Sequence, residues 1–395
     1  TVLERSTCLR RLYGAIIVKN DEIISKAVDI IKNGGLVAFP TETVYGLGGN
    51  ALNPESSKKI YQAKGRPSDN PLIVHIGNIG QIDGIAEEFP EKAKALADKF
   101  WPGPLTMVLK KKPCVPLETT GGLGTVAVRM PAHKTAKMLL SSGLYIAAPS
   151  ANTSGKPSPT KGTYVYEDLN GRIDMIIEDD TVNIGVESTI IDMTREVPTL
   201  LRPGHISRED IEKVIGHIDV DETIAGIENY KKVDENTKPL APGMMYRHYA
   251  PDASLVLVDS ENKGGKSVVE HITKLALEDI SNNKKTVILT TDENTDIYKK
   301  LMSEANVSDE SILFTKCTDF FKTLSDISNN ILIYVVSLGN RGELSSIEQN
   351  LFMGLRLCND IGAESIYSET FDTDNQGLAV MNRLIKAAGD KIIKV

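Results

Sequence analysis

The sequence predicts an α/β fold in two domains, and three observations lead to this prediction. Short apolar runs typical of strands alternate with amphipathic stretches typical of helices in both halves of the chain. Between the halves, from about residue 216 to residue 251, this periodicity gives way to polar residues, proline and glycine. The chain has 395 residues, of which 41% are hydrophobic, so each half can bury a core of its own. We expect a sheet domain at 16–208, an interdomain segment at 209–252 and a smaller domain at 253–395.

The first half contains apolar runs that are typical of buried strands. They cover residues 36–40, 72–76, 105–109, 126–130, 146–149 and 189–192. Amphipathic stretches at 22–32, 55–63 and 90–100 separate several of these runs. This alternation predicts a sizeable open twisted sheet covered by helices.

The second half repeats this alternation on a smaller scale. Its apolar runs cover residues 255–258, 287–290, 312–314, 331–336 and 365–367, with helical patterns at 266–277 and 346–361. Strands that alternate with helices in this way indicate a small, Rossmann-like parallel sheet. The segment before it ends in Pro-Leu-Ala-Pro-Gly-Met-Met-Tyr-Arg-His-Tyr-Ala-Pro at 239–251, where three prolines and a glycine oppose regular structure.

Composition excludes several classes of protein. Lys plus Arg number 45 against 53 Asp plus Glu, a formal charge of -8 that argues against the basic surface of a stable nucleic-acid binder. The four cysteines, Cys8, Cys114, Cys317 and Cys358, include no C-x-x-C pair, which favours a reducing compartment over a zinc or redox motif. No apolar run approaches the ~20 residues that span a bilayer. We expect a cytoplasmic protein without a membrane partner.

The first candidate for chemistry is the segment Pro-Thr-Glu-Thr-Val-Tyr-Gly-Leu-Gly at 40–48. It follows a buried strand and combines hydroxyls, one carboxylate and glycines where open α/β sheets place their ligands. Gly46, Gly48 and Ala51 also fit a dinucleotide-binding fingerprint. That alternative requires a tight strand-to-glycine junction, whereas here Pro54 delays the next helix.

Cations and polar groups then recur after predicted helices and within predicted strands. Lys64 and Arg66 stand at a helix end beside Gly65, where they either cap the helix or hold an anion. Arg129 lies inside an apolar strand, where its charge is costly unless a carboxylate or another anion meets it. Either a structural salt bridge or a ligand would meet this need. His75, also in a strand, is by itself typical of a hydrogen-bonded core histidine.

Two further segments contain hydroxyl and amide groups. Residues 147–160 read Ala-Ala-Pro-Ser-Ala-Asn-Thr-Ser-Gly-Lys-Pro-Ser-Pro-Thr, which is also ordinary turn chemistry. Residues 185–189 read Gly-Val-Glu-Ser-Thr, and Leu-Arg-Pro-Gly at 201–204 adds another cation. A Walker loop is not formed, because Ser260 stands where Gly264-Gly-Lys-Ser267 would require a glycine.

Taken in order, these segments resemble one family. The series is PTETVYGLG, KGRPSDNPLIVHI, WPGPLT, TVAVRMP, APSANTSGKPSPT, GVESTI, LRPG and APGMMYRHYAP. It is similar to that of the two-domain threonylcarbamoyl-AMP synthases of the YrdC group. The resemblance is densest over 16–208, continues through the interdomain segment and is weaker in the second domain.

The resemblance implies an enzyme that condenses L-threonine with bicarbonate and transfers the product to the α-phosphorus of ATP, giving L-threonylcarbamoyl-AMP and pyrophosphate. The product would pass to a tRNA threonylcarbamoyl transferase complex, which modifies an adenosine next to the anticodon. Magnesium is implied with ATP, held mainly by phosphates and water because no carboxylate cage is recognisable. Such chemistry depends on positioning and electrostatics.

The resemblance also implies residue roles. Lys64 and Arg66 would be catalytic. The threonine and bicarbonate site would use Thr41, Thr43, His75, Arg129, Ser150 and Ser188, with Arg129 facing the substrate carboxylate. ATP would be bound by Lys64, Arg66, Asn70, Thr125, Asn152, Ser158, Arg202 and Tyr246.

Alternatives remain open from the residues themselves. An RNA-binding module could use Lys64, Arg66 and neighbouring lysines, although the acidic balance opposes it. Carbamoyl or hydride transfer by an unrelated nucleotide enzyme would rest on the glycine pattern alone. The aromatic and methionine residues at 244–249 predict either a lid over the active site or a surface that docks the two domains.

Overall fold

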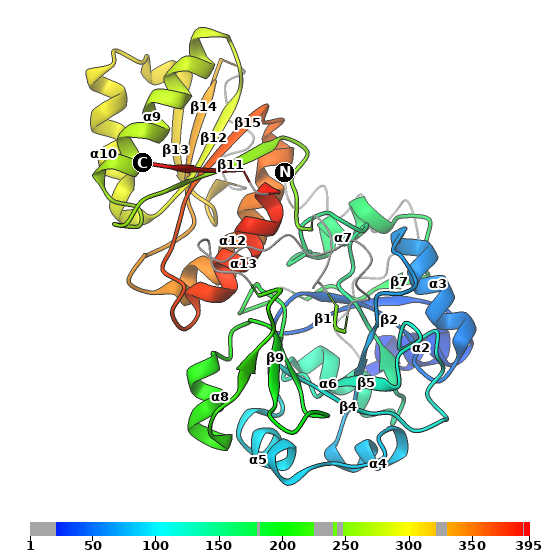
Figure 1. Cartoon of the computed structure of the whole chain (residues 1–395). Coiled ribbons are helices and arrows are strands. Elements are labelled where there is room, and N and C mark those ends of the chain that lie inside the picture. Colours follow the sequence, from blue (N-terminus) through cyan, green and yellow to red (C-terminus); the bar gives the residue numbers. More distant parts are fainter. Residues whose placement is uncertain (1–20, 180–181, 225–239, 243–247, 321–329, 390) are drawn as a thin grey trace. The chain divides into compact units, whose positions relative to one another are not determined.

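The computed structural model describes residues 21–179, 182–224, 240–242, 248–320, 330–389 and 391–395 (Figure 1). The chain forms two compact units. The first consists of Thr1–Ser154 and Ser158–Tyr246, and the second of Arg247–Val395 together with the short stretch Gly155–Pro157. Both units are α/β, as the sequence predicts.

The first unit is built on a ten-stranded mixed sheet. Its strands are β1 (Val37–Pro40), β2 (Tyr45–Asn50), β3 (Ile73–His75), β4 (Leu105–Lys110), β5 (Thr125–Arg129), β6 (Ile146–Ala147), β7 (Met175–Ile176), β8 (Thr189–Asp192), β9 (Thr199–Arg202) and β10 (Asp219–Val220). They are arranged in the order β10-β9-β8-β4-β5-β3-β6-β2-β1-β7. Its described α-helices are α2 (Asp21–Lys32), α3 (Pro54–Lys64), α4 (Ile82–Ile85), α5 (Glu91–Phe100), α6 (Lys134–Leu140), α7 (Gly162–Leu169) and α8 (Arg208–Ile215).

Helix α3 illustrates how local sequence fixes an element that carries a predicted site residue. Asn53 caps its N-terminus by accepting a hydrogen bond from the Glu55 backbone N–H, and Pro54 occupies the first turn, where no N–H is needed. Gly65 ends the helix in the left-handed conformation, with φ of 61°. Lys64 is therefore placed at the last helical position.

The two faces of the first sheet bury different neighbours. The larger core lies on one face, where Val74, Met107 and Val128 pack with residues of α3, α5, α7 and α8. On the other face, α2 and α6 cover the region of β1 and β6. A small cluster completes this second face over the central strands: Ile73, Val108, Ala127, Ile190, Leu201 and Ala241. His75, Thr106 and Arg129 alternate with core residues along their strands, so they lie on this second face.

The glycine pattern at Gly46 and Gly48 does not form a dinucleotide-binding loop. Residues 45–50 form β2, which pairs antiparallel with β1 through Phe39↔Gly46 and Val37↔Gly48. A Cβ on Gly48 would lie 2.8 Å from the Phe39 ring and 2.9 Å from Ile146. The glycines are needed for close packing within a hairpin, and this excludes the dinucleotide alternative.

The second unit contains a six-stranded, all-parallel sheet. Its strands are β11 (Ser254–Asp259), β12 (Thr286–Thr290), β13 (Ile312–Lys316), β14 (Ile333–Ser337), β15 (Ser365–Glu369) and β16 (Ile392–Lys394), in the order β13-β14-β12-β15-β11-β16. Its described helices are α9 (Lys266–Ser281), α10 (Asp292–Glu304), α12 (Leu344–Ile361) and α13 (Gly377–Ala388).

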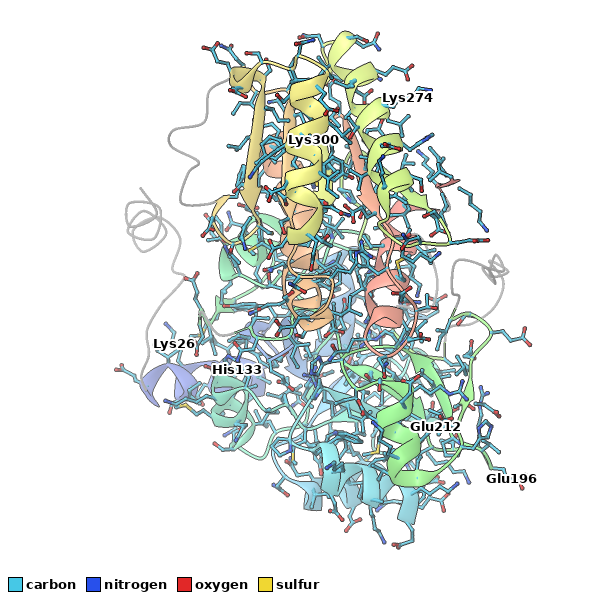
Figure 2. The ribbon with its side chains drawn as sticks, turned by 90° about the vertical axis from the view of Figure 1, so that its left-hand side faces the viewer. Lys26, His133, Glu196, Glu212, Lys274 and Lys300 are labelled. Carbon is cyan, nitrogen blue, oxygen red and sulfur yellow. The ribbon has the colours of Figure 1, made fainter. Side chains whose placement is uncertain are left out.

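Helices α9 and α10 pack on the sheet through an apolar cluster that includes Val269, Ile288, Tyr298 and Val335. Their charged residues, including Lys274 and Lys300, are exposed (Figure 2). This division into an apolar and a charged side is what amphipathic helices on a parallel sheet require.

The predicted interdomain segment, 209–252, contains regular structure that belongs to the first unit. Most of α8 lies in it, with Ser207 as N-cap, and β10 pairs with β9. Residues 240–242 also belong to the first unit, whereas His248 and Tyr249 belong to the second. In the part of the chain that the structure describes, no helix is long and apolar enough to cross a membrane.

Candidate active site

Three polar residues form a row across the central strands of the first sheet. His75 and Arg129 were predicted from the sequence, and Thr106 was not. His75 on β3 is the register partner of Arg129 on β5, and Arg129 is the partner of Thr106 on β4. Paired residues on adjacent strands project to the same face, so the sheet places these three side chains next to one another. All are buried.

Arg129 is held by three different acceptors. Nη2 donates to the Glu42 carboxylate at 2.7 Å, Nη1 to the Thr43 hydroxyl at 2.9 Å and Nε to the Gly103 carbonyl at 3.2 Å. A guanidinium has five N–H donors. Within the described part of the chain, this leaves one N–H on each terminal nitrogen without an acceptor, which suits a carboxylate.

Arg129 lowers the pKa values of its two ionisable neighbours, Glu42 and His75. Burial opposes ionisation of Glu42, but the Arg129 guanidinium and backbone N–H groups outweigh this effect and hold the pKa of the carboxyl below its usual value. Burial of the ring, together with the Arg129 charge, lowers the pKa of His75 to about 3. At neutral pH the site therefore contains a guanidinium, a carboxylate and a neutral imidazole.

Thr41 and Thr43 lie in the loop between β1 and β2. Their hydroxyl oxygens are 2.8 Å apart, and Thr41 also donates to the Val44 carbonyl at 2.6 Å. Backbone hydrogen bonds from Ile184 and Gly185 to the carbonyls of Glu42 and Thr43 hold this loop from the other side. The loop thus presents both hydroxyls beside Arg129 in a fixed arrangement.

Ser188 and Arg202 extend the polar row beyond β4. The Ser188 hydroxyl is 2.7 Å from that of Thr106 and accepts from Arg202 Nη2 at 3.2 Å. Arg202 also donates to the Ser188 carbonyl from Nε and Nη2, and to the Pro242 carbonyl from Nη1 at 3.1 Å. Arg202 therefore connects Ser188, a predicted threonine-site residue, to the described part of the interdomain segment.

Lys64 joins two other predicted residues. Its ammonium donates to the Ser150 carbonyl and, at 2.6 Å, to the Asn152 carbonyl. In return the Lys64 carbonyl accepts from the Ser154 backbone N–H at 2.8 Å. Ser150 forms an isolated bridge with Gly46 of β2. This bridge places the loop that contains Ser150 and Asn152 beside the β1–β2 hairpin, whose connecting loop contains Thr41 and Thr43.

Arg66, Asn70 and Thr125 lie at or before the starts of the strands that carry His75 and Arg129: the first two precede β3, and Thr125 begins β5. Arg66 Nη2 donates to the carbonyls of Asn70 and Pro71 at 3.3 and 3.2 Å. Thr125 begins β5 and shares the face of Arg129, roughly 13 Å away along the strand at about 3.3 Å per residue. The structure therefore does not bring Thr125 to Arg129.

Two predicted nucleotide residues need separate mention. Ser158 is fully buried and donates to Glu187 Oε1 at 2.5 Å, so in this structure its hydroxyl holds a neighbouring loop. Tyr246 lies outside the described residues.

Sequence reasoning missed three residues that the structure brings to the site. Glu42, Thr106 and Glu187 partner Arg129, Ser188 and Ser158 respectively. Each stands inside a quoted motif. The signal for Glu42 was present, because a buried arginine requires a carboxylate or ligand and this carboxylate lies in the neighbouring motif.

Protein ligands for a resident metal are not apparent in the described ranges, which contain no group of three or more His, Cys, Asp or Glu side chains that could hold an ion. Besides the Glu42 and Glu187 carboxylates, the predicted site residues are cations, hydroxyls, amides and a histidine. Such a donor set fits anionic ligands.

Two family models match consecutive parts of the chain. A family described as "Telomere recombination" matches residues 29–204, and one described as "Threonylcarbamoyl-AMP synthase, C-terminal domain" matches residues 206–389.

Similar whole proteins are known from distant organisms. The chain is 42% identical to a threonylcarbamoyl-AMP synthase of Bacillus subtilis, over 95% of both chains. It is 45% identical to one of Pyrococcus abyssi, over 93% of this chain and 95% of the other. The crystal structure of P. abyssi Sua5 complexed with L-threonine matches with a TM-score of 0.80 and 42% identity, covering 97% of this chain and 99% of that one. The chain therefore belongs to the family of two-domain threonylcarbamoyl-AMP synthases.

Proposed function

We propose that the chain synthesises L-threonylcarbamoyl-AMP from L-threonine, bicarbonate and ATP, with release of pyrophosphate, for the modification of tRNA next to the anticodon. The observation that carries this proposal is the polar row on one sheet face, where Arg129 keeps two N–H donors beside Thr41, Thr43 and His75. Family membership and the L-threonine complex of the P. abyssi relative support the same substrate.

The threonine carboxylate would bind Arg129, and neighbouring hydroxyls would orient the rest of the amino acid. Its amino group then attacks the carbon of bicarbonate, and loss of water gives N-carboxythreonine. His75 is neutral and adds no charge that would repel the ammonium form of the substrate. A buried site also protects the carbamate from water.

The new carboxylate would attack the α-phosphorus of ATP and expel pyrophosphate. Lys64, Arg66 and Arg202 are the cations expected to stabilise the charge that develops. Each of these side chains donates to at least one backbone carbonyl oxygen, and these bonds hold the cation in place. Asn70, Thr125, Asn152, Ser158 and Tyr246 stay proposed nucleotide residues.

Magnesium would accompany ATP, neutralising phosphate charge while held mainly by phosphates and water. The product would pass to a tRNA threonylcarbamoyl transferase complex. We further propose that residues 239–251 act as a lid, and the cytoplasmic location stays a prediction. The lid is supported by Ala241, which packs with Leu201 and Val108 on the site face.

The test is mass-spectrometric detection of L-threonylcarbamoyl-AMP after incubation of the pure protein with ATP, L-threonine and bicarbonate. We expect product that depends on all three substrates and is independent of RNA. The competing RNA-binding function predicts instead RNA affinity that falls steeply with salt, and no product. RNA binding without product would contradict the proposal.

A further inference from the structure

Glu42 is a buried carboxylate held in place from two sides. Glu42 is 7% exposed to solvent. Oε1 accepts from Arg129 Nη2 at 2.7 Å, and Oε2 accepts from the His133 backbone N–H at 3.3 Å. The backbone bond comes from the N-cap residue of α6, so the carboxylate cannot swing away without breaking a contact to a helix start.

The Glu42 carboxylate helps determine which N–H groups of Arg129 remain available to a ligand. Glu42 and Thr43 are adjacent in the chain and take one N–H from each terminal nitrogen, while Gly103 takes the Nε proton. A planar guanidinium with three fixed bonds has no rotational freedom left. Its two remaining N–H groups therefore keep one orientation before any ligand arrives, which lowers the cost of binding.

Glu42 also sets the charge of the pocket. Arg129 alone would make the pocket cationic. Its side chain is only 4% exposed, so water would screen this charge little. With Glu42, whose pKa is held below its usual value, the pair is neutral at physiological pH. A cationic pocket favours any small carboxylate, whereas a neutral one does not repel the ammonium group of a zwitterion.

We infer that Glu42 is a positioning residue for Arg129 and that its charge makes the pocket select a zwitterionic amino acid over a plain carboxylate. This inference rests on the proposed function, because it assumes that Arg129 binds the threonine carboxylate.

The experiment measures, by calorimetry on the full chain, the affinity for L-threonine and for 3-hydroxybutyrate, which lacks the amino group. For Glu42→Gln we expect threonine affinity to fall about 10-fold or more, since charge-assisted hydrogen bonds at a buried site are involved. Affinity for 3-hydroxybutyrate should hold or rise, so the preference for threonine shrinks. ATP affinity should change less than threefold.

A second variant separates position from charge. Glu42→Asp keeps the carboxylate but shortens the side chain, so both ligands should weaken in parallel while the preference survives. Asp192→Asn is the matched control, because Asp192 is also a buried carboxylate paired with an arginine, Arg195, on the same sheet. It should leave both affinities unchanged.

The inference is overturned if Glu42→Gln folds and keeps the threonine preference of the original chain. If that variant does not fold, original-strength binding of threonine by Glu42→Asp overturns it instead. Failure of the proposed function looks different. In that case the unaltered chain, or Arg129→Leu compared with it, would show no Arg129-dependent threonine binding at all.

Discussion

His75 is a histidine that the fold keeps uncharged. Burial and the Arg129 charge lower its pKa to about 3, whereas the unfolded chain takes up a proton near 6.5. Below pH 6.5 the unfolded state therefore binds one more proton than the folded state, and stability falls as the pH is lowered toward 3. The loss from this one group is about 1.4 kcal/mol per pH unit.

We therefore expect the free energy of unfolding of His75→Gln to depend less steeply on pH between 6 and 4 than that of the original chain. Urea unfolding at a series of pH values measures this slope. Parallel curves for the two proteins would contradict the buried neutral histidine. The absolute stability of the variant does not matter, because only the slope carries the prediction.

The two cations that we propose to be catalytic, Lys64 and Arg66, give a second prediction. Lys64→Ala or Arg66→Ala should lower kcat about 10²-fold or more, since each removes a cation that we propose to stabilise the developing negative charge. Lys59→Ala is the matched control for Lys64, because Lys59 lies on the same helix and also donates to a backbone carbonyl, that of Gly34, at 2.8 Å. Near-normal turnover of either site variant at saturating substrates would reject its assigned role.

At the scale of residues, the sequence predicted that a buried arginine needs an anionic partner, but it did not predict which group that partner is. An arginine in an apolar strand required an anionic partner, and both a structural ion pair and a substrate carboxylate satisfied that rule. The structure contains the ion pair with Glu42, and the unused N–H donors leave room for the substrate as well. Ser158 could not be placed from sequence, because hydroxyls in turn-rich segments serve loops as readily as ligands.

Among the elements, those with strong apolar periodicity were predicted well. The run expected at 189–192 is β8, and the run at 105–109 is β4 with one residue more. Strand β2 was missed, because a strand with three glycines has little intrinsic β preference and is fixed by packing against Phe39 and Ile146. Strand β16, at Ile392–Lys394, is too short for a periodic signal.

The junction of β8 and β9 offers a prediction at the scale of elements. Gly204 follows β9, and a Cβ there would lie 2.5 Å from the Thr189 backbone nitrogen and 2.7 Å from the Glu187 carbonyl oxygen. These are backbone atoms that cannot yield cheaply, so Gly204→Ala should cost about 1–3 kcal/mol of stability. It should also lower activity, because Ser188 and Arg202 lie at the ends of the two strands that the added Cβ would push apart.

Thermal unfolding and turnover measure the two effects. Gly124→Ala is the control, since a Cβ at that glycine meets nothing within 4 Å and its backbone is not left-handed. If both alanine variants unfolded at the same temperature and worked equally well, the close approach at Gly204 would have no energetic meaning.

For the molecule as a whole, the sequence predicted two α/β units and a proline-rich segment between them. Where regular structure of the first unit ends was harder to predict, because α8 and β10 are short and mostly polar. Their attachment depends on partners distant in sequence: Ile211 joins the main core and β10 pairs with β9. At the end of the segment, Tyr249 packs against Phe352 of the second unit in a tilted arrangement, with ring centroids 5.0 Å apart.

The proposed lid is the prediction that belongs to this scale. A chain ending after Ile224 keeps every described strand and helix of the first unit, and Ile224 itself packs on the main core. Circular dichroism should find this fragment folded. The fragment lacks Ala241, which packs on Val108 and Leu201, and the Pro242 carbonyl that accepts from Arg202. Because these contacts to the site are lost, we expect at least ~10-fold less product.

Limited proteolysis of the full chain tests the same lid without truncation. Arg247 offers a trypsin site at the end of the proposed lid, and closure over bound ligands should protect it when ATP and L-threonine are both present. Cleavage after Lys284, which is exposed on the second unit, is the internal control and should keep its rate. Protection requires both substrates if the lid closes over the assembled site, because water must be excluded only once the carbamate can form. Unchanged cleavage at Arg247 with saturating substrates, together with full activity of the fragment, would rule the lid out and leave the segment as a tether that docks the second unit.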